Sequence, residues 1–422
     1  MKKSSITIVG LGYVGLTLAL LVSKKGYKVF GIDIDENKVK IINDGRSPIE
    51  DDYIIENMKY KIHATTDFSV IDKSEIIIVC IQTPITKDNR PDLKPLKSVL
   101  DSIVKNINNG QLIIIESTVA PGTCRKIVKP ILEKSGFKVG KNIHLAHCPE
   151  RIDPGNKKWT IENIPRVIGA LSDEGRERSA IFYKSIINAP IKKLSSIEVA
   201  EATKIVENTF RDINIAFVNE LAKSFDKLRI DVLEVIESAA TKPFAFIPHY
   251  PGCGVGGHCI SVDPYYLIEK ARDSGFEHKF LELARSINKS MPEYTVKRTI
   301  EGLNEIARCI KDTEISILGI SYKPNTDDMR ESPSFEIVSR LKDMGAKLKV
   351  YDPYIKKMST VDSLNSALNS KCIIIVTAHD EFKEIDIEKL KQSGIEVIID
   401  GRNCLNKDKI INSGIVYKGI GR

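Results

Sequence analysis

The sequence predicts an α/β protein with two doubly wound, Rossmann-like domains joined by a long central helix. Short apolar, strand-like runs alternate with helical stretches in both halves of the 422-residue chain, which is typical of parallel sheets with helices on both faces. Between the halves, residues 196–228 keep a helical spacing of apolar side chains without any proline or glycine. We therefore expect three parts, at residues 1–195, 196–310 and 311–422.

The composition narrows the classes of function. The net charge of +7 is spread thinly, so nucleic acid is not indicated as a partner, whereas an anionic small molecule is compatible with it. No apolar run approaches the roughly 20 residues that a membrane span requires, and we expect no membrane partner. The eight cysteines show no CxxC pair or zinc spacing, which predicts no metal site and reduced thiols in the cytoplasm.

A glycine-rich turn follows the first predicted strand, residues 6–9. The turn reads GLGYVG, with the positions Gly10, Gly12, Tyr13, Val14 and Gly15. In this context the first glycine makes the turn, the second lets a pyrophosphate approach a helix N-terminus, and the third lets the helix pack on the strand. The second strand ends at Asp33, which would bind the ribose hydroxyls of adenosine and so favour NAD over NADP. The alternative is an incidental glycine-rich turn in an α/β protein.

Polar residues follow the next three predicted strands. These strands are expected at residues 75–81, 111–116 and 142–147, and they run into Thr83, Thr118 and Glu150. Ligands of doubly wound sheets bind beyond the carboxyl ends of the strands, so the three side chains should point towards one place. Each of them could instead be a turn former or a helix cap. Lys38 could likewise face the adenosine or be a solvated helix lysine.

The central helix carries Lys204 and Asn208 four residues apart, on one face. An ammonium group and a carboxamide side by side form a pair of donors suited to a developing oxyanion. On these two residues alone, a solvated helix face is the favoured alternative.

A second glycine-rich stretch, PGCGVGGHCISVDPYY, begins at Pro251. Its glycines, Gly252, Gly254, Gly256 and Gly257, would let the backbone approach a ligand closely. Cys259 follows them at once and Asp263 comes four residues later, an order suited to a nucleophile with a nearby proton acceptor. A tight turn followed by a buried cysteine is the alternative.

The second half repeats the alternation of strands and helices. After a helical segment at residues 267–308, strands are expected at 314–320, 347–351, 372–377 and 396–399. Lys323 and Arg330 lie in the loop after the first of these strands, and Arg402 follows the last. Cationic groups at strand ends suit a pyrophosphate, although each could be a surface charge or pair with Asp327, Asp328 or Glu331. Two α/β halves with a bridging helix favour a substrate held between domains.

These motifs, in this order, resemble those of the nucleotide-sugar 6-dehydrogenases. The resemblance rests on GLGYVG, ESTVAPGT, PER, EATKIVENTFRDINIAFVNE, GVGGHCISVDPYYL and GISYKPNTDDMRESPS, and it covers essentially the whole chain. Members of that family oxidise the C6 alcohol of a UDP-sugar to the carboxylate, with two NAD⁺ and a cysteine-bound intermediate. The resemblance thus implies an NAD-binding first part, a central part for dimerisation and catalysis, a UDP-binding last part, and a homodimer or higher homo-oligomer.

The resemblance also implies a role for each matched residue. Cys259 would form a thiohemiacetal and then a thioester at C6. The remaining catalytic positions would be Lys204, Asn208, Asp263, Glu150 and Thr118. The cofactor positions would be Gly10, Gly12, Tyr13, Val14, Gly15, Asp33, Lys38, Thr83, Thr118 and Arg330. The substrate positions would be Glu150, Arg151, Lys204, Asn208, Pro251, Gly252, Gly256, Gly257, Tyr322, Lys323 and Arg402.

The identity of the sugar is predicted from finer likenesses. The stretch ATKPF from Ala240, together with PERIDPGN, looks most like the branch that acts on UDP-N-acetylglucosamine. UDP-N-acetylmannosamine is the alternative, and UDP-glucose enzymes are more distant, since they usually carry KD where this chain has VDP. Cys253 stands where relatives commonly have proline. It could bond to Cys259 under oxidation, but in a reducing compartment we favour a packing role.

Overall fold

The computed structural model describes residues 4–86, 88–153, 156, 158–257 and 259–422, so Pro154 and Gly155 of PERIDPGN and His258 of GVGGHC lie outside it. The chain forms two compact units: unit 1 contains Met1–Glu207 and Tyr265–Phe276, and unit 2 contains Asn208–Pro264 and Glu277–Arg422. The long helix α7 (Ile197–Leu228) begins in unit 1 and ends in unit 2. It confirms the predicted central helix.

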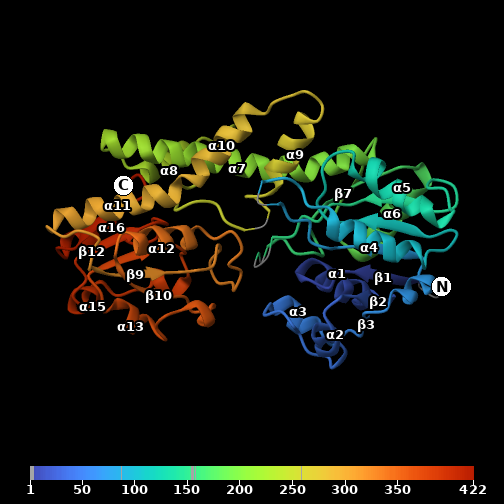
Figure 1. Ribbon diagram of the computed structural model, residues 1–422, viewed down its shortest axis with the longest axis horizontal. Coiled ribbons are helices and arrows are strands. Elements are labelled where there is room, and N and C mark those ends of the chain that lie inside the picture. Colours follow the sequence, from blue (N-terminus) through green and yellow to red (C-terminus); the bar gives the residue numbers. More distant parts are fainter. Residues whose placement is uncertain (1–3, 87, 154–155, 157, 258) are drawn as a thin grey trace. The chain divides into compact units, whose positions relative to one another are not determined.

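Unit 1 contains an eight-stranded sheet of the order β3-β2-β1-β4-β5-β6-β7-β8. Strands β1, β2, β3 and β7 of this sheet are labelled in Figure 1. Its first six strands follow the 3-2-1-4-5-6 order of dinucleotide-binding folds, in which the ligand crevice lies where the order reverses, between β1 and β4. The strands are β1 (Ser5–Val9), β2 (Lys28–Ile32), β3 (His63–Thr65), β4 (Ile76–Val79), β5 (Leu112–Ile115), β6 (His144–His147), β7 (Arg166–Ala170) and β8 (Ile191–Lys193).

Both faces of this sheet are buried, because alternate side chains of a strand point to opposite faces. Ile8 packs in a core with Leu16 of α1 and Phe182 of α6, whereas its neighbour Val9 packs with Leu96 of α4. The helices of unit 1 are α1 (Tyr13–Lys24), α2 (Glu36–Asn43), α3 (Asp52–Asn57), α4 (Lys94–Val104), α5 (Lys129–Leu132), α6 (Asp173–Ile186) and α9, which begins at the end of the adjoining segment of unit 2 (Asp263–Arg272).

Unit 2 contains a five-stranded parallel sheet of the order β10-β9-β11-β12-β13. The order reverses between β9 and β11, which places a second crevice at the carboxyl ends of these strands. The strands are β9 (Glu314–Leu318), β10 (Lys347–Tyr351), β11 (Cys372–Ile375), β12 (Val397–Asp400) and β13 (Val416–Gly419).

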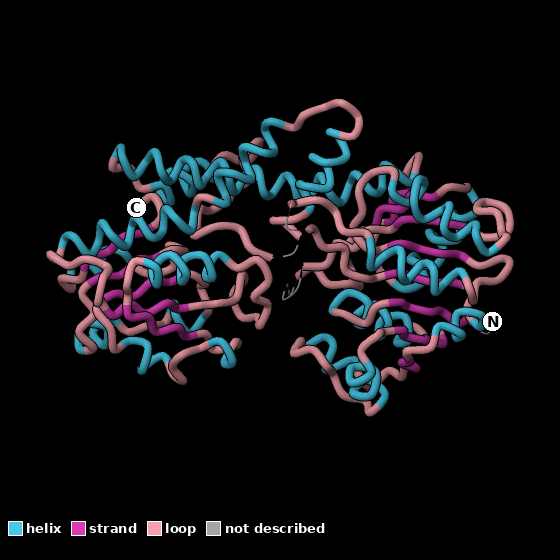
Figure 2. The backbone as a smooth tube through the Cα atoms, viewed as in Figure 1, coloured by secondary structure: helices cyan, strands magenta, loops and turns pink. Residues whose placement is uncertain are grey.

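Helices cover this second sheet in the same way, with the strands of each unit lying between helical layers (Figure 2). Ile374 packs with Leu303 of α11 and Leu341 of α12, whereas Ile373 packs with Phe382 of α14. The helices of unit 2 are α8 (Val232–Ala240), α10 (Lys279–Lys289), α11 (Met291–Glu305), α12 (Pro333–Asp343), α13 (Leu364–Leu368), α14 (Asp380–Lys383), α15 (Ile387–Gln392) and α16 (Lys407–Asn412).

The structure corrects the sequence predictions in three places. The helical segment expected at residues 267–308 is three helices, because Gly275 adopts a φ of +83° after α9 and Pro292 opens α11. Strand β7 runs antiparallel to β6, so the first sheet is mixed and not wholly parallel. The sequence pattern also does not predict four strands: β3, β8 and β13 are sheet edges, and β7 lies next to one.

Candidate active site

The glycine-rich turn connects β1 to the N-terminus of α1. Gly10 has a φ of +93°, and a Cβ there would lie 2.7 Å from the carbonyl oxygen of Cys80 at the end of β4. A Cβ at Gly15 would lie 1.8 Å from the carbonyl oxygen of Gly10. A Cβ at Gly12 would meet no atom within 4 Å. Packing therefore demands Gly10 and Gly15, while Gly12 leaves open space at the helix N-terminus where a phosphate could approach.

Asp33 faces the same turn from the end of β2. One carboxylate oxygen accepts hydrogen bonds from the backbone N–H of Leu11 and from Lys38 Nζ, each at 2.9 Å, and the other accepts from the N–H of Asp35 at 3.1 Å. Burial opposes ionisation of Asp33, but the hydrogen bonds outweigh it and lower its pKa. Lys38 is therefore a partner of Asp33 and not simply a solvated helix lysine.

The other two residues of the turn lie on the first turn of α1. The Tyr13 hydroxyl donates to the Asp51 carboxylate at 3.2 Å, and Val14 is half-buried. The tyrosine thus links α1 to the start of α3.

The structure brings two of the predicted strand-end residues together. Thr83 Oγ1 donates a 2.7 Å hydrogen bond to the carbonyl oxygen of Thr118, and the carbonyl oxygen of Thr83 accepts one of 2.6 Å from the Tyr266 hydroxyl. Tyr266 is fully buried on α9. The segments after β4 and β5 are therefore tied together, as predicted from their place at adjacent strand ends.

Glu150 and Arg151 follow β6. The Glu150 carboxylate accepts a hydrogen bond from the backbone N–H of Ile152. Arg151 is held in an ion pair with Glu207, at 2.6 Å, and donates to the carbonyl oxygen of Pro165 at 2.9 Å. The guanidinium of Arg151 is thus engaged by the protein itself.

Lys204 and Asn208 lie on a buried face of α7, with 8% and 1% of their surfaces exposed. The solvated helix face, which was the favoured alternative on the sequence alone, is therefore wrong for both residues. Lysine is rarely buried to this extent without a specific role.

A backbone hydrogen bond joins Asp263 to Cys259, the nucleophile candidate. The backbone N–H of Asp263, the first residue of α9, donates to the carbonyl oxygen of Cys259 at 2.9 Å. The side-chain amide of Asn208 donates to the buried Asp263 carboxylate. Cys259 itself is exposed, in contrast to the buried cysteine of the alternative interpretation.

The glycines of this loop make close contacts within unit 2. Gly252 donates its N–H to Asn219 Oδ1 at 3.0 Å, and a Cβ on it would lie 2.6 Å from Arg402 Nη1. A Cβ on Gly256 or Gly257 would lie 2.6 Å from side-chain atoms of Tyr322. Five of the predicted substrate positions therefore form two contact groups, Gly252 with Arg402 and the pair Gly256 and Gly257 with Tyr322, at distances that only glycine permits.

The remaining cations lie around the second crevice. Lys323 is half-buried in the loop after β9, and Arg402 Nε donates to the carbonyl oxygen of Val376 at 2.6 Å. Arg330 pairs with Asp328, whose hydrogen bond is the largest of the effects that raise the pKa of Arg330. The ion-pair alternative thus holds for Arg330, although its carbonyl oxygen also accepts the N–H of Gly257 at 2.9 Å.

Three consecutive domains of one enzyme family match the chain. They are the NAD binding domain of the UDP-glucose/GDP-mannose dehydrogenase family at residues 4–187, its central domain at 198–290 and its UDP binding domain at 316–407. A UDP-N-acetyl-D-mannosamine dehydrogenase of Pyrococcus horikoshii is 35% identical over 424 residues, with 99% of each chain covered. The chain belongs to the UDP-glucose/GDP-mannose dehydrogenase family. It is an NAD-dependent UDP-sugar dehydrogenase, an oxidoreductase.

Other members of the family are similarly close. A UDP-N-acetyl-D-glucosamine 6-dehydrogenase of Pseudomonas aeruginosa is 34% identical, covering 97% of this chain and 99% of its own. The solved structure of the Pyrococcus horikoshii enzyme superimposes with a TM-score of 0.93 at 34% identity, covering 99% of both chains. That of the UDP-N-acetyl-mannosamine dehydrogenase Cap5O from Staphylococcus aureus has a TM-score of 0.86 at 32% identity, covering 99% and 98%. The predicted family, fold class and cofactor are thus confirmed.

Three residues of the dehydrogenase that contact the site were not singled out from the sequence. Tyr266 binds Thr83, Asn219 binds Gly252, and Glu201 of α7 binds the turn after Thr118. Two of them, Glu201 and Asn219, belong to the helix motif that carries Lys204 and Asn208, at helical spacing from those residues, and this spacing was the available signal.

Cys253 is a packing residue in this dehydrogenase. It is fully buried as a free thiol, with its Sγ 3.2 Å from the carbonyl oxygen of Gly401. A Cβ on Gly401 would lie 2.0 Å from that sulfur. The expected packing role is confirmed, and Cys253 forms no disulfide with Cys259.

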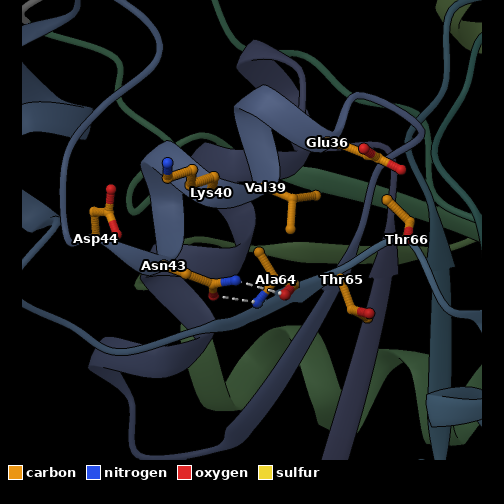
Figure 3. Close-up of a pocket in the computed structure, with 8 residues that line it drawn as sticks. All are labelled: Glu36, Val39, Lys40, Asn43, Asp44, Ala64, Thr65 and Thr66. Carbon is orange, nitrogen blue, oxygen red and sulfur yellow. Dashed lines mark hydrogen bonds between the residues drawn. The ribbon is translucent and has the colours of Figure 1, made fainter.

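A surface pocket of about 380 Å³ lies between α2 and the edge strand β3 (Figure 3). The Asn43 side chain binds both the N–H and the carbonyl oxygen of Ala64, which covers part of the open strand edge. None of the predicted site residues lines this pocket, so it is separate from the candidate site.

Within the described residues, no helix is long and apolar enough to cross a membrane.

Proposed function

We propose that the enzyme oxidises the C6 alcohol of a UDP-N-acetylhexosamine to the carboxylate, in a four-electron reaction through a covalent intermediate on Cys259. The observation that carries this proposal is the arrangement of Cys259 one turn before the buried Asp263–Asn208 pair. The exposed thiol of Cys259 and the hydrogen-bonded carboxylate of Asp263, four residues later, are suited to act as nucleophile and proton acceptor.

Most of the proposed cofactor contacts belong to unit 1. The open space at Gly12 fits a pyrophosphate on the N-terminus of α1, and the Asp33 carboxylate with Lys38 fits the adenosine ribose. Thr83, Thr118 and Arg330 complete the proposed set of contacts, with Tyr13 and Val14 on the first helical turn. When bound, NAD⁺ supplies the hydride acceptor, so two NAD⁺ and one water convert the alcohol to the carboxylate with release of two NADH and three protons.

Cys259 would carry the sugar between the two oxidations. Its thiolate adds to C6 of the aldehyde, a C–S bond forms, and the carbonyl oxygen takes up a proton to give a thiohemiacetal. After the second oxidation, water attacks C6 of the thioester, the C–S bond breaks, and the thiolate is restored. Arg330 supports this role: Asp328 is the main cause of its raised pKa, Tyr322 and then Cys259 make smaller electrostatic contributions, and a nearby cation favours a thiolate.

The other catalytic residues would stabilise charge or move protons. Lys204 and Asn208 stabilise the oxyanion at C6, and Asp263 accepts a proton from the reacting group. Glu150 and Thr118 position the water that hydrolyses the thioester. The burial of Lys204 and Asn208 supports these roles, since charge stabilisation is stronger where water is excluded.

The substrate would be bound through its uridine diphosphate and its sugar. The cations Lys323 and Arg402 lie at the carboxyl ends of strands in the UDP-binding domain, where they suit a diphosphate. The sugar would contact Lys204, Asn208, Glu150 and Arg151, and the nucleotide would contact Tyr322 and the loop positions Pro251, Gly252, Gly256 and Gly257.

The acetylated hexosamine is proposed from the relatives. Enzymes named for UDP-N-acetyl-D-mannosamine and for UDP-N-acetyl-D-glucosamine match the whole chain at 35% and 34% identity, so identity does not separate the epimers. The stretches ATKPF and PERIDPGN favour the glucosamine epimer, while the match to the Pyrococcus horikoshii structure favours the mannosamine epimer. Both are therefore candidates, with UDP-glucose less favoured.

We further propose that the enzyme is a cytoplasmic homodimer that associates through α7. Five large apolar side chains at helical spacing are exposed along this helix, namely Val199, Val206, Phe210, Phe217 and Leu228. Because exposed apolar stripes of this kind mark protein interfaces, a second copy of the chain is the partner that the family resemblance implies. The division of the chain into three parts, at residues 1–195, 196–310 and 311–422, remains a prediction.

The test is to assay the purified protein with NAD⁺ against UDP-N-acetylmannosamine, UDP-N-acetylglucosamine and UDP-glucose in parallel. The proposal expects two NADH per sugar with one of the two acetylated substrates. One NADH per sugar would indicate a two-electron dehydrogenase. Tight binding without any NADH would indicate a nucleotide-sugar binding protein that has kept the fold, and either result would refute the proposed reaction.

A further inference from the structure

Glu201 has no part in the reaction proposed above, yet its carboxylate is fully buried in the first half of α7. One carboxylate oxygen accepts the backbone N–H of Gly122 at 2.6 Å, and the other accepts the N–H of Cys124 at 2.7 Å. Both donors belong to the turn that follows β5, in which Gly122 has a φ of +89°. Because the acceptor is an ionisable carboxyl group, these are charge-assisted hydrogen bonds when it is ionised.

The burial of Glu201 is costly. Burial raises the pKa of its carboxyl group to about 7, against the lowering effect of the hydrogen bonds from Cys124 and Gly122. The charge of Glu198 adds to the raising effect. A buried glutamate is rare unless it is paired, and the hydrogen-bond partners of Glu201 among the described residues are two backbone N–H groups and the thiol of Cys124. Because burying this carboxyl group costs free energy, we expect Glu201 to have a specific role.

The turn that Glu201 binds follows Thr118 in the chain, in the same segment after β5. The start of this segment is held by Thr83, whose hydroxyl donates to the carbonyl oxygen of Thr118, and the end is held by Glu201. Lys204 lies three residues after Glu201 on α7, and residues at this spacing are neighbours on a helix surface. Glu201 thus ties the segment of Thr118 to the helical turn of Lys204, and all of these residues belong to unit 1.

We propose that Glu201 is a positioning residue that sets the place of Thr118 relative to Lys204. The inference rests on the proposed function, which assigns catalytic roles to Thr118 and Lys204. If Glu201 is altered, the UDP-sugar and NAD⁺ keep their other proposed contacts, but Thr118, which is proposed to orient the hydrolytic water, is displaced. Displacements of about 1 Å can slow a reaction on the order of 100-fold, so the loss should appear in kcat and not in KM.

The variant that tests this is Glu201→Gln, which keeps the shape but retains only one acceptor oxygen. Its matched control is Glu198→Gln, one helical turn earlier. Glu198 pairs with Arg125, at 2.5 Å, on the same segment after β5, but at the surface and through a side chain. The control therefore removes an ion pair between the same two elements without touching the backbone of the turn.

Two measurements are made on each full-length protein. Steady-state NADH formation should show kcat lowered on the order of 10–100-fold in Glu201→Gln, without a rise in either KM, and a covalent sugar adduct on Cys259 should accumulate and be seen in the intact mass. Hydrogen exchange should become faster in the peptide that contains Gly122 and Cys124. Glu198→Gln should match the wild type in both measurements.

Three outcomes would overturn the inference: a wild-type kcat in Glu201→Gln, an equal loss in the two variants, or a loss confined to KM. If Glu201→Gln does not fold, Glu201→Asp takes its place. Its shorter side chain cannot reach both N–H groups, so wild-type kcat and exchange in that variant would also overturn the inference. If the wild type oxidises none of the UDP-sugars, the proposed function fails, whereas the exchange measurement still decides whether Glu201 holds the turn.

Discussion

The side-chain amide of Asn208 donates a hydrogen bond to the carboxylate of Asp263, and both residues are buried. Asn208 Oδ1 in turn accepts a hydrogen bond from Arg211, which sets the orientation of the amide. Since Asp263 is also the first residue of α9 and its N–H binds the Cys259 carbonyl, the contact joins the central helix to the cysteine loop. Asn208 therefore orders the proposed proton acceptor, in addition to its proposed contact with the substrate.

Replacing Asp263 with asparagine keeps the shape of this group but removes its proton-accepting charge. We expect kcat to fall on the order of 10²–10⁴-fold, because positioned acid–base groups contribute about that much, while the affinity for the UDP-sugar changes little. Steady-state kinetics and calorimetric binding measure the two effects. Asp273→Asn, an exposed aspartate just after α9, is the control and should behave as the wild type. An Asp263→Asn enzyme with normal kcat would exclude the proton-transfer role.

The Cys259→Ser variant tests the covalent intermediate. A hydroxyl is a far weaker nucleophile than a thiolate, so formation of the acid should stop and the yield should fall from two NADH per sugar to at most one. Binding of the UDP-sugar should be retained, since the thiol forms no part of the proposed uridine diphosphate contacts. Cys309→Ser, which alters another exposed cysteine, serves as the control. A variant that still releases two NADH per sugar would rule out the thioester.

Alanine at Gly12 and at Gly15 should act in different ways. A Cβ at Gly15 would lie 1.8 Å from the Gly10 carbonyl oxygen, so Gly15→Ala should shift the turn and lower the thermal midpoint of unit 1. A Cβ at Gly12 would meet nothing within 4 Å, so Gly12→Ala should fold normally but weaken NAD⁺ binding roughly tenfold or more, because the methyl group occupies the approach to the helix N-terminus. Thermal unfolding and NAD⁺ titration separate these effects. Equal NAD⁺ affinity in Gly12→Ala and the wild type would argue against this turn as the pyrophosphate site.

The exposed apolar stripe of α7 predicts the oligomeric state. The double substitution Phe210→Asp and Phe217→Asp places charges on two side chains that are 47% and 52% exposed in the single chain. If these side chains lie in a homodimer interface, sedimentation should show a dimer for the wild type and a monomer for the variant. Phe276→Asp changes an exposed phenylalanine elsewhere and should leave the dimer intact. A variant that sediments as the wild type would place the interface elsewhere.

The buried imidazole of His147 should make the folded state of unit 1 less stable at acid pH. Its imidazole is fully buried in β6, neither ring nitrogen has a hydrogen-bond partner among the described residues, and burial lowers its pKa from 6.5 to about 3. Since the unfolded chain binds a proton below pH 6.5 and the folded unit does not, the stability that the neutral histidine contributes is full above pH 6.5 and declines as the pH falls towards 3. The loss is about 1.4 kcal/mol per pH unit, or about 2 kcal/mol at pH 5.

The substitution His147→Leu should remove this loss. The thermal midpoint of unit 1 should then fall less between pH 7 and pH 5 than it does in the wild type, and calorimetry at the two pH values measures the difference. His63→Gln, at an exposed histidine of β3, should leave the pH dependence unchanged. An identical fall in His147→Leu and in the wild type would contradict the prediction.

The sequence by itself determined the fold class, the family and the cofactor. Both sheets could be predicted from the sequence, because strands such as IIIV and LIII are buried on both faces and so lack polar residues. The turn at Gly10–Gly15 was readable for a similar reason, since its glycines, its flanking elements and Asp33 are all local in the chain. Short edge strands such as β3 and β8 were missed, because three residues carry too little periodicity to be recognised.

What only the tertiary structure decided was which polar side chains are buried and what they bind. Lys204 and Asn208 have the spacing of any solvated pair on a helix, and burial against other elements distinguishes them from such a pair. The sequence likewise does not decide whether Arg330 forms an ion pair or contacts a ligand, and no sequence pattern predicts that Glu201 is buried and binds a turn. Burial and hydrogen-bond partners depend on segments far apart in the chain, such as α7 and the turn at Gly122, and a local pattern of residues carries no information about which distant backbone will face it.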